Sequence, residues 1–283
     1  MTAQPLIVNL ATTGMVPTKA DNPAVPLAPA EIAEDCRRCA AAGATVVHIH
    51  ARDAEGRPTY RKEVFRETIG LVRAAVPEMV VCVTTSGRVF GDPEQRGEVL
   101  DLDGPVKPDM ASLTLGSMNF PREASVNAPS TIRALAERMQ ERGIVPELEV
   151  FDVGMLDYAR YLIERGILRE PFYFNLLLGS LGTLAATPLH LAQLVGALPA
   201  GATWAAAGIG RFQLPMNALA VAMGGHVRVG LEDNLFLDTA KQVPATNLAL
   251  VQRVAGIARA MGRPVATCAE ARRRIGLGDP PRA

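Results

Sequence analysis

The sequence predicts a single-domain α/β protein with the (β/α)8 TIM-barrel fold. Short runs of β-branched and apolar residues recur along the chain, and a helical pattern follows nearly every one. Apolar residues are spread evenly along the 283 residues and no linker interrupts them, which favours one large domain over two small ones. Eight such βα units in a chain of this length are typical of the barrel. We therefore expect residues 1–283 to form one barrel with a C-terminal tail from about residue 276.

The predicted strands are bounded by turn residues and separated by amphipathic helices. Several helices have a proline or serine in the first turn and end at a glycine, such as Gly43 or Gly262, as helix caps require. Helices are expected, for example, at about 29–42, 129–142, 188–198 and 245–261. Strands are expected at residues 6–13, 44–51, 80–86, 110–116, 144–151, 172–179, 203–210 and 226–233.

Charge and composition exclude several classes of function. Lys+Arg and Asp+Glu both number 29, so the sequence has neither the basic footprint of a nucleic-acid-binding protein nor a polybasic membrane patch. No apolar run approaches the roughly 20 residues of a membrane span, and no charged leader pattern precedes the first apolar stretch. Cys36, Cys39, Cys82 and Cys268 fall in predicted helices or an apolar strand without a disulfide framework. We therefore expect a cytoplasmic protein with structural cysteines.

Polar residues alternate with apolar ones in several predicted strands. A parallel strand covered by helices is expected to be apolar on both faces. Glu147 and Glu149 nevertheless share one face of the fifth strand, and Arg228 and Glu232 share one face of the eighth. Because the outer faces pack on helices, these side chains must point into the barrel, where charges need partners. We predict a charged site at the C-terminal strand ends, where barrel enzymes place their chemistry.

His48 and His50 lie two residues apart in the second predicted strand. Side chains alternate along a strand with a period of two, so both imidazoles lie on one face. This arrangement suits a shared divalent metal ion, most of all zinc. A hydrogen-bonded pair of core histidines is the alternative. Catalytic zinc usually has three protein ligands, and Glu232 is the best third because it lies inward at the end of the eighth strand. His226 begins that strand and His190 begins a helix, so neither is expected to bind the metal.

Arg228 and Asp233 are candidates for proton transfer beside the metal. A buried guanidinium needs carboxylates, which Glu147, Glu149 or Asp233 could supply. Asp233 lies where the strand becomes a loop, so it can turn into the pocket as a general base whose pKa depends on Arg228 and the metal. A purely structural ion-pair network is the alternative.

Hydroxyl and backbone N–H groups at the end of the third predicted strand could bind a substrate carboxylate. They belong to Thr84, Thr85, Ser86 and Gly87, and Ser112 of the fourth strand adds a further hydroxyl.

Six segments of the chain together resemble the β-keto acid cleavage enzymes. They are NLATTGMVPTKADNPAVPLAPAEIA, AGATVVHIHARDAEGRPT, KPDMASLTLGSMNF, PELEVFDVGM, TWAAAGIGR and GGHVRVGLEDN, and the similarity runs in order to about Ile275. The resemblance implies a (β/α)8 barrel whose zinc is held by two histidines and one glutamate. It also implies a reaction in which a β-keto acid and acetyl-CoA give acetoacetate and the CoA ester of the remainder.

Carried over by position, the resemblance implies that His48, His50 and Glu232 bind one zinc ion per chain and that Arg228 with Asp233 takes a proton from the keto acid. Zinc would bind the carboxylate and the 3-oxo group and stabilise the enolate. The carbanion would attack the acetyl-CoA thioester, and the CoA thiol would return to the original keto carbon. No protein nucleophile is needed.

The substrate side chain is expected to differ from that of the family's type member. Thr84 and Ser112 keep hydroxyls where the type member has Ser and Thr. Val16, however, replaces a glutamate of the first βα loop that matches an amino-bearing substrate, so we expect a neutral or anionic β-keto acid. Arg88, at the mouth of the third strand, could meet a distal carboxylate, a hydroxyl or a CoA phosphate, or could be an exposed surface arginine.

Other functions remain open at this point. A metal-dependent hydrolase barrel also uses an H-x-H pair but needs further histidines on later strands, and His190 and His226 are wrongly placed for that. A CoA-independent metal-dependent aldolase or lyase would keep the same zinc site. A non-catalytic metal- or ligand-binding barrel would show no turnover. Family members associate, so a homotetramer is the expected assembly.

Overall fold

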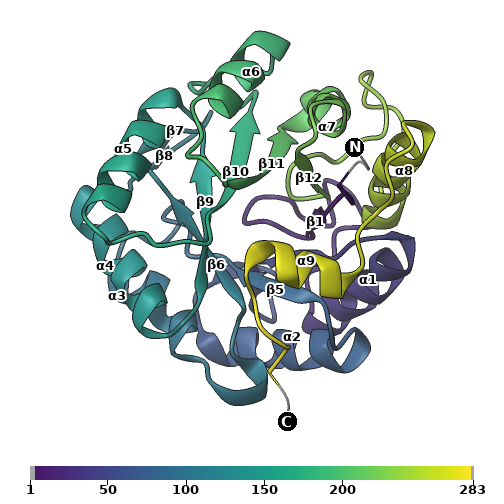
Figure 1. The fold of residues 1–283 in the computed structure, drawn as a ribbon. Coiled ribbons are helices and arrows are strands. Elements are labelled where there is room, and N and C mark those ends of the chain that lie inside the picture. The colour runs from purple at the N-terminus through teal and green to yellow at the C-terminus, as the bar shows by residue number, and fades with distance from the viewer. Residues whose placement is uncertain (1–3, 282–283) are drawn as a thin grey trace.

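The computed structural model describes residues 4–281 and confirms the predicted barrel. The parallel strands pair side by side, and the ring closes because β1 pairs with both β2 and β12. Figure 1 shows the ring and the helices around it. In ring order the strands are β1 (Val8–Ala11), β2 (Val46–Ile49), β5 (Val80–Val83), β6 (Met110–Thr114), β9 (Val145–Val150), β10 (Tyr173–Leu178), β11 (Thr203–Gly208) and β12 (His226–Val229).

Helices follow the strands and cover the outside of the barrel (Figure 1). No helix among residues 4–281 is long and apolar enough to cross a membrane. The helices are α1 (Pro29–Ala42), α2 (Lys62–Ala75), α3 (Pro93–Gly97), α4 (Pro129–Glu141), α5 (Val153–Glu164), α6 (Pro188–Gly196), α7 (Gln213–Ala222), α8 (Asn247–Ala260) and α9 (Cys268–Ile275).

The loops after the second, third and fourth barrel strands depart from the regular pattern that the sequence predicts. Between β5 and β6 the barrel helix is replaced by the five-residue α3 and two 3-10 segments. Two small antiparallel hairpins extend the loops that follow β2 and β6. These additional elements are η1 (Glu98–Asp101), η2 (Gly104–Val106), β3 (Ala51–Arg52) with β4 (Pro58–Thr59), and β7 (Met118–Asn119) with β8 (Ala124–Ser125).

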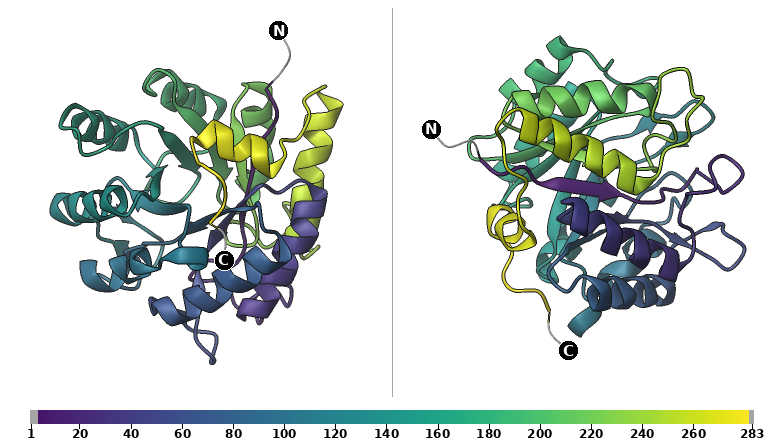
Figure 2. Two further views of the ribbon diagram at one scale, coloured as in Figure 1. Left: turned by 60° about the horizontal axis from the view of Figure 1, so that its bottom comes forward. Right: turned by 90° about the vertical axis from the view of Figure 1, so that its right-hand side faces the viewer.

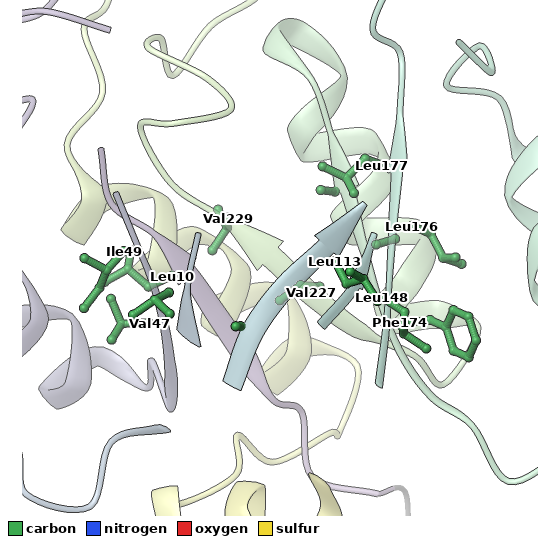
Figure 3. Close-up of a cluster of buried hydrophobic side chains, with 14 of the residues drawn as sticks. Leu10, Val47, Ile49, Leu113, Leu148, Phe174, Leu176, Leu177, Val227 and Val229 are labelled. Atoms are coloured by element: carbon green, nitrogen blue, oxygen red, sulfur yellow. The ribbon is translucent and has the colours of Figure 1, made fainter. Parts of the chain in front are cut away.

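Alternate side chains of the strands point outward and inward, as the period of two requires. Outward-facing residues such as Leu10, Leu148 and Val227 are buried between strands and helices (Figure 3). Inside the barrel, an apolar layer that includes Val46 and Val80 lies toward the N-terminal strand ends. The next layer is polar and buried, and it contains Asn9, His48, Cys82, Ser112, Glu147, Asn175 and Arg228. The predicted charged interior is therefore present.

Helix α9 lies across the N-terminal end of the barrel, away from the βα loops (Figures 1 and 2). The eight-unit pattern does not predict this ninth helix. It begins with a capping box formed by Thr267 and Glu270. Arg272 then donates to Asp109 at 2.8 Å, and Arg73 of α2 reaches the other oxygen of Asp109 at 3.1 Å. The buried carboxylate thereby fastens α9 to the start of β6.

The second strand is shorter than predicted. β2 ends at Ile49, so His50 follows the strand instead of belonging to it. A separate two-residue strand, β3, then pairs with β4, and this pairing draws the chain away from the barrel. The period of two still holds across the break, because the Nε2 atoms of His48 and His50 lie 3.3 Å apart on the same side of the chain.

The eighth strand is also shorter than predicted, and this changes the placement of two candidate residues. β12 ends at Val229, and Glu232 and Asp233 lie in the turn that follows. Gly230 begins this turn because a Cβ there would lie 2.0 Å from the carbonyl oxygen of Ala11. The close approach to β1 brings both carboxylates back over the mouth of the barrel.

Candidate active site

A cavity of about 550 Å³ opens at the C-terminal ends of the strands. Its floor is polar and contains the five residues for which the sequence predicts metal binding or proton transfer: His48, His50, Arg228, Glu232 and Asp233. Its walls are largely apolar and come from several βα loops, with Met15, Pro17, Phe120, Phe151, Leu181 and Phe236 among them.

The imidazoles of His48 and His50 and the carboxylate of Glu232 converge at one point of the floor. The two Nε2 atoms lie 3.3 Å apart, and Nε2 of His50 lies 3.1 Å from Oε1 of Glu232. The three side chains are at most 14 % exposed. Two imidazoles and one carboxylate that face the same point form the ligand set of a catalytic zinc site.

An unsatisfied polar atom at this point fits a bound cation. Oε2 of Glu232 is buried and has no hydrogen-bond partner within the described residues. A buried carboxylate oxygen without a partner is costly, and a cation would satisfy it. Gly14, at φ +70°, lets the loop after β1 press against Glu232, since a Cβ there would lie 2.7 Å from Cγ of Glu232.

A second group of possible metal ligands lies deeper in the barrel and comprises His48, Cys82 and Glu147. Nδ1 of His48 lies 2.8 Å from Oε2 of Glu147, and the Cys82 sulfur lies 3.5 Å from the same oxygen. Burial and the charge of Glu147 raise the pKa of Cys82 well above its ordinary value, so that its thiol is protonated in the metal-free protein. Cys82 and Glu147 also do not line the cavity. The upper group is therefore the better metal site.

Arg228 is buried and binds three carboxylates. Its Nε and Nη2 donate to the two oxygens of Asp233 at 2.9 and 3.2 Å. Nη2 also donates to Glu232 at 2.6 Å, and Nη1 donates to Glu149 at 3.3 Å. Burial disfavours the charge, but Asp233 and Glu232 raise the pKa of Arg228 well above its ordinary value. A permanently charged guanidinium therefore orients both a metal-ligand candidate and the neighbouring carboxylate.

Glu232 and Asp233 are adjacent in the chain but differ in basicity. Burial would raise the pKa of Glu232, yet Arg228 and the two histidines hold it well below its ordinary value. Burial raises the pKa of Asp233 above its ordinary value, although Arg228 acts in the opposite direction. Glu232 thus stays ionised, as a metal ligand must, whereas Asp233 is the more basic group, as a general base requires.

Four of the predicted substrate-contact residues line the cavity: Val16, Thr84, Ser86 and Arg88. Oγ1 of Thr84 accepts the backbone N–H of Ser86 at 3.1 Å. The Thr84 O–H has no acceptor among residues 4–281, so it can donate to a substrate oxygen. Val16 lies at the rim and is 51 % exposed.

The other three predicted contact residues lie behind the wall of the cavity. The backbone N–H of Thr85 donates to Oγ of Ser112 at 3.1 Å, and Oγ1 of Thr85 donates to the Ser112 carbonyl at 2.5 Å. Gly87 packs against the Arg96 guanidinium, since a Cβ there would lie 2.6 Å from Nη1. These residues tie β5 to β6 and shape the loop that presents Thr84.

Arg88 reaches the cavity, but its guanidinium already has partners. Nε donates to Glu123 at 2.5 Å, and the guanidinium lies over the ring of Phe120 at 4.0 Å from its centroid. An anionic ligand at this place would have to compete with Glu123.

Three residues that hold the buried glutamates in place were not predicted from the sequence as part of the site. Asn9 and Asn175 donate to Glu147 at 2.6 and 3.3 Å, and Thr114 donates to Glu149 at 2.7 Å. Each lies on the inward face of its strand, and this alternation was the one signal that could have identified them. Glu147 itself, expected as a partner of Arg228, contacts His48 more closely: its Oε2 lies 2.8 Å from His48 and 4.0 Å from Arg228.

The remaining histidines lie outside the site. Nδ1 of His226 accepts the backbone N–H of Ile7 at 3.0 Å, and burial and nearby arginines lower the pKa of His226 to about 3, so that it is neutral. His190 lies in the first turn of α6, where its backbone N–H donates to the capping hydroxyl of Thr187. Cys36 and Cys39 are buried in α1, as expected for structural cysteines.

Fold and site together define a (β/α)8 barrel with two histidines, a glutamate and an arginine–aspartate pair at its mouth. The sequence model of the β-keto acid cleavage enzymes matches residues 5–277. The chain belongs to this family, which confirms the resemblance seen in its six segments.

Individual relatives match nearly the whole chain. It is 40% identical over 274 residues to 3-keto-5-aminohexanoate cleavage enzyme of Fusobacterium nucleatum subsp. nucleatum, across 96% of this chain and 98% of the relative. It is 39% identical over 277 residues to 3-oxoadipate:acetyl-CoA acetyltransferase of Cupriavidus necator, across 97% of this chain and 95% of the relative. The solved apo structure of ObcA matches with a TM-score of 0.76 and 23% identity over 90% of this chain and 66% of that one, a likeness in fold.

Proposed function

We propose that this protein is a zinc-dependent β-keto acid cleavage enzyme that uses acetyl-CoA as its second substrate. The observation that carries the proposal is the convergence of His48, His50 and Glu232 beside the Arg228–Asp233 pair on the floor of one cavity. Family membership supports it, and one relative is named as an acetyl-CoA acetyltransferase.

His48, His50 and Glu232 would hold the zinc, and the cavity would leave its remaining position open to substrate. When bound, zinc would polarise the 3-oxo group of the keto acid and stabilise the negative charge of the enolate. Thr84 and Ser86, on the wall beside the floor, would bind substrate oxygen atoms through their hydroxyls.

Asp233 would remove the proton from C2 of the keto acid. Its carboxylate is held by both Nε and Nη2 of Arg228, which fixes its orientation. The buried position keeps its pKa above the ordinary value, and this strengthens it as a base. Arg228 offsets the charge of the carboxylates gathered around it.

The bonds of the reaction balance without a protein nucleophile. The C2 carbanion attacks the thioester carbon of acetyl-CoA, a C–C bond forms, and the C–S bond breaks to release the CoA thiolate. The thiolate then attacks the original 3-oxo carbon, and the bond between C2 and C3 breaks. A new acyl-CoA leaves, and the acetoacetate carbanion takes back the proton from Asp233. The burial of Cys36, Cys39 and Cys82 agrees with a mechanism that uses no thiol of the protein.

The test is incubation of the purified protein with a panel of β-keto acids and acetyl-CoA that carries ¹³C in both acetyl carbons. We expect acetoacetate labelled at C3 and C4, together with an unlabelled acyl-CoA derived from the keto acid. Cleavage that proceeds without acetyl-CoA would contradict the proposal and indicate a metal-dependent lyase. An absence of turnover on every keto acid would contradict it in favour of a non-catalytic binding barrel.

A further inference from the structure

We infer that Glu147, held in place by Asn9 and Asn175, is a positioning residue that sets the orientation and the tautomer of His48. The inference rests on the proposed zinc site, but it concerns a group of side chains below that site. None of the three residues lines the cavity, and Glu147 lies closer to His48 than to Arg228, so we expect them to act on the reaction through His48.

The contact between Glu147 and His48 determines which ring nitrogen is free. Oε2 of Glu147 lies 2.8 Å from Nδ1 of His48, and each side chain is at most 1 % exposed. An ionised carboxylate only accepts hydrogen bonds, so His48 must carry a proton on Nδ1. The lone pair of a neutral His48 is then on Nε2, the atom that faces His50 and the candidate metal position.

Asn9 and Asn175 fix Glu147 from two other strands. Nδ2 of Asn9, on β1, donates to Oε1 of Glu147 at 2.6 Å, and Nδ2 of Asn175, on β10, donates to the same oxygen at 3.3 Å. Two amide donors on one oxygen leave no place for a proton there. The amide oxygens of both asparagines are buried without a hydrogen-bond partner within residues 4–281, so these side chains act through their NH2 groups, which donate to Glu147.

The two candidate histidine ligands are therefore supported differently. His48 is oriented by a carboxylate, whereas Nδ1 of His50 has no partner among the described residues. Carboxylates that orient a metal-binding histidine raise its basicity and are worth about 10–100-fold in metal affinity. Because only His48 has a carboxylate at Nδ1, we assign this gain in metal affinity to Glu147.

Glu149 provides a matched control two residues further along β9. It is a buried glutamate on the same face, but it contacts Arg228 at 3.3 Å and Thr114 at 2.7 Å and makes no hydrogen bond to a histidine. A general effect of removing a buried charge from the barrel would appear in both Glu147→Gln and Glu149→Gln. An effect on the metal through His48 would appear only in the first.

The experiment measures the zinc affinity of Glu147→Gln and Glu149→Gln by competition with a chromophoric chelator, and the visible absorption of the cobalt-substituted proteins. We expect Glu147→Gln to bind zinc about 10–100-fold more weakly and to change the cobalt spectrum, because its NH2 group must face either His48 or the asparagine donors. We expect Glu149→Gln to retain the wild-type affinity and spectrum. A folded Glu147→Gln variant with both properties unchanged would overturn the inference.

Asn9→Ala keeps the inference testable if Glu147→Gln does not fold. It removes the shorter amide contact and leaves the carboxylate in place, so we expect a smaller loss of zinc affinity with a cobalt spectral change of the same sign. Unchanged affinity and spectrum in Asn9→Ala would then overturn the inference. If the wild-type protein binds no stoichiometric zinc, the proposed zinc site itself fails, which is a different result from wild-type affinity in the variants.

Discussion

Asp233 and Glu232 are adjacent carboxylates with different surroundings. Both bind Arg228, but Glu232 also faces two imidazoles, whereas both oxygens of Asp233 bind the guanidinium. The surrounding positive groups keep Glu232 ionised, and burial makes Asp233 the stronger base. At the residue scale, this difference supports the roles that we propose, metal binding for Glu232 and proton transfer for Asp233.

Replacing Asp233 by Asn should remove the base and leave the metal site intact. We expect kcat to fall by about 10²–10⁴-fold, the usual worth of a general base, while zinc content stays near the wild-type value. Steady-state kinetics and elemental analysis of the same preparation measure the two effects. If Asp233→Asn keeps most of its activity, the base lies elsewhere, and Glu149 is the next carboxylate on the cavity floor.

Val16 should select against a cationic substrate side chain. An ammonium group facing valine would lose the carboxylate pairing that a glutamate supplies. We expect neutral or anionic β-keto acids to exceed 3-keto-5-aminohexanoate in kcat/KM by at least about tenfold, which is about 1.4 kcal/mol. A competition assay measures the ratio directly.

The Val16→Glu variant tests the same idea in the opposite direction, with Val16→Gln as an uncharged control of similar size. We expect the glutamate variant alone to gain relative activity on the amino substrate. A wild-type preference for the amino substrate would show that the side chain is recognised elsewhere in the cavity. Equal gains in both variants would show that polarity, and not charge, matters at this position.

At the scale of single elements, side-chain alternation could be predicted from the sequence, but strand ends could not. The period of two correctly placed His48 and His50 on one side and turned Glu147 and Arg228 into the barrel. The end of β12 depends on the contact between Gly230 and the carbonyl of Ala11, more than 200 residues away. Such a contact follows from barrel closure and leaves no local pattern.

Helix α9 provides a stability prediction at this scale. Arg272→Ala removes one of the two arginines that bind the buried Asp109 and should lower the free energy of unfolding by about 2 kcal/mol, because Arg73 still pairs with the carboxylate. Arg273→Ala, at the next and exposed position, should change it by no more than about 0.5 kcal/mol. Urea denaturation of both variants gives the comparison. Equal effects would show that the contact with Asp109 does not fasten the helix.

At the scale of the whole molecule, the eightfold repetition of strand and helix was enough to predict a closed barrel. The repetition could not predict the shortened third unit or the additional helix that covers the N-terminal end. It also could not show that Asn9 and Glu147, which are 138 positions apart, would meet. Contacts across the barrel depend on the register of all eight strands, which single strands do not encode.

The assembly remains a prediction at this scale. We expect a homotetramer, because closed symmetric assemblies are common among soluble enzymes. Light scattering at micromolar concentration should then give a mass near 120 kDa, four times the 30.1 kDa of one chain. A mass near 30 kDa would refute it.

The most direct test of the proposed metal site is an anomalous difference map from crystals of the purified protein, recorded at the zinc edge. We expect one peak per chain, roughly 2.0–2.2 Å from Nε2 of His48, Nε2 of His50 and a carboxylate oxygen of Glu232. A peak enclosed by His48, Cys82 and Glu147 would contradict this assignment and the positioning role of Glu147 together. A map without any zinc peak would contradict the zinc-dependent mechanism.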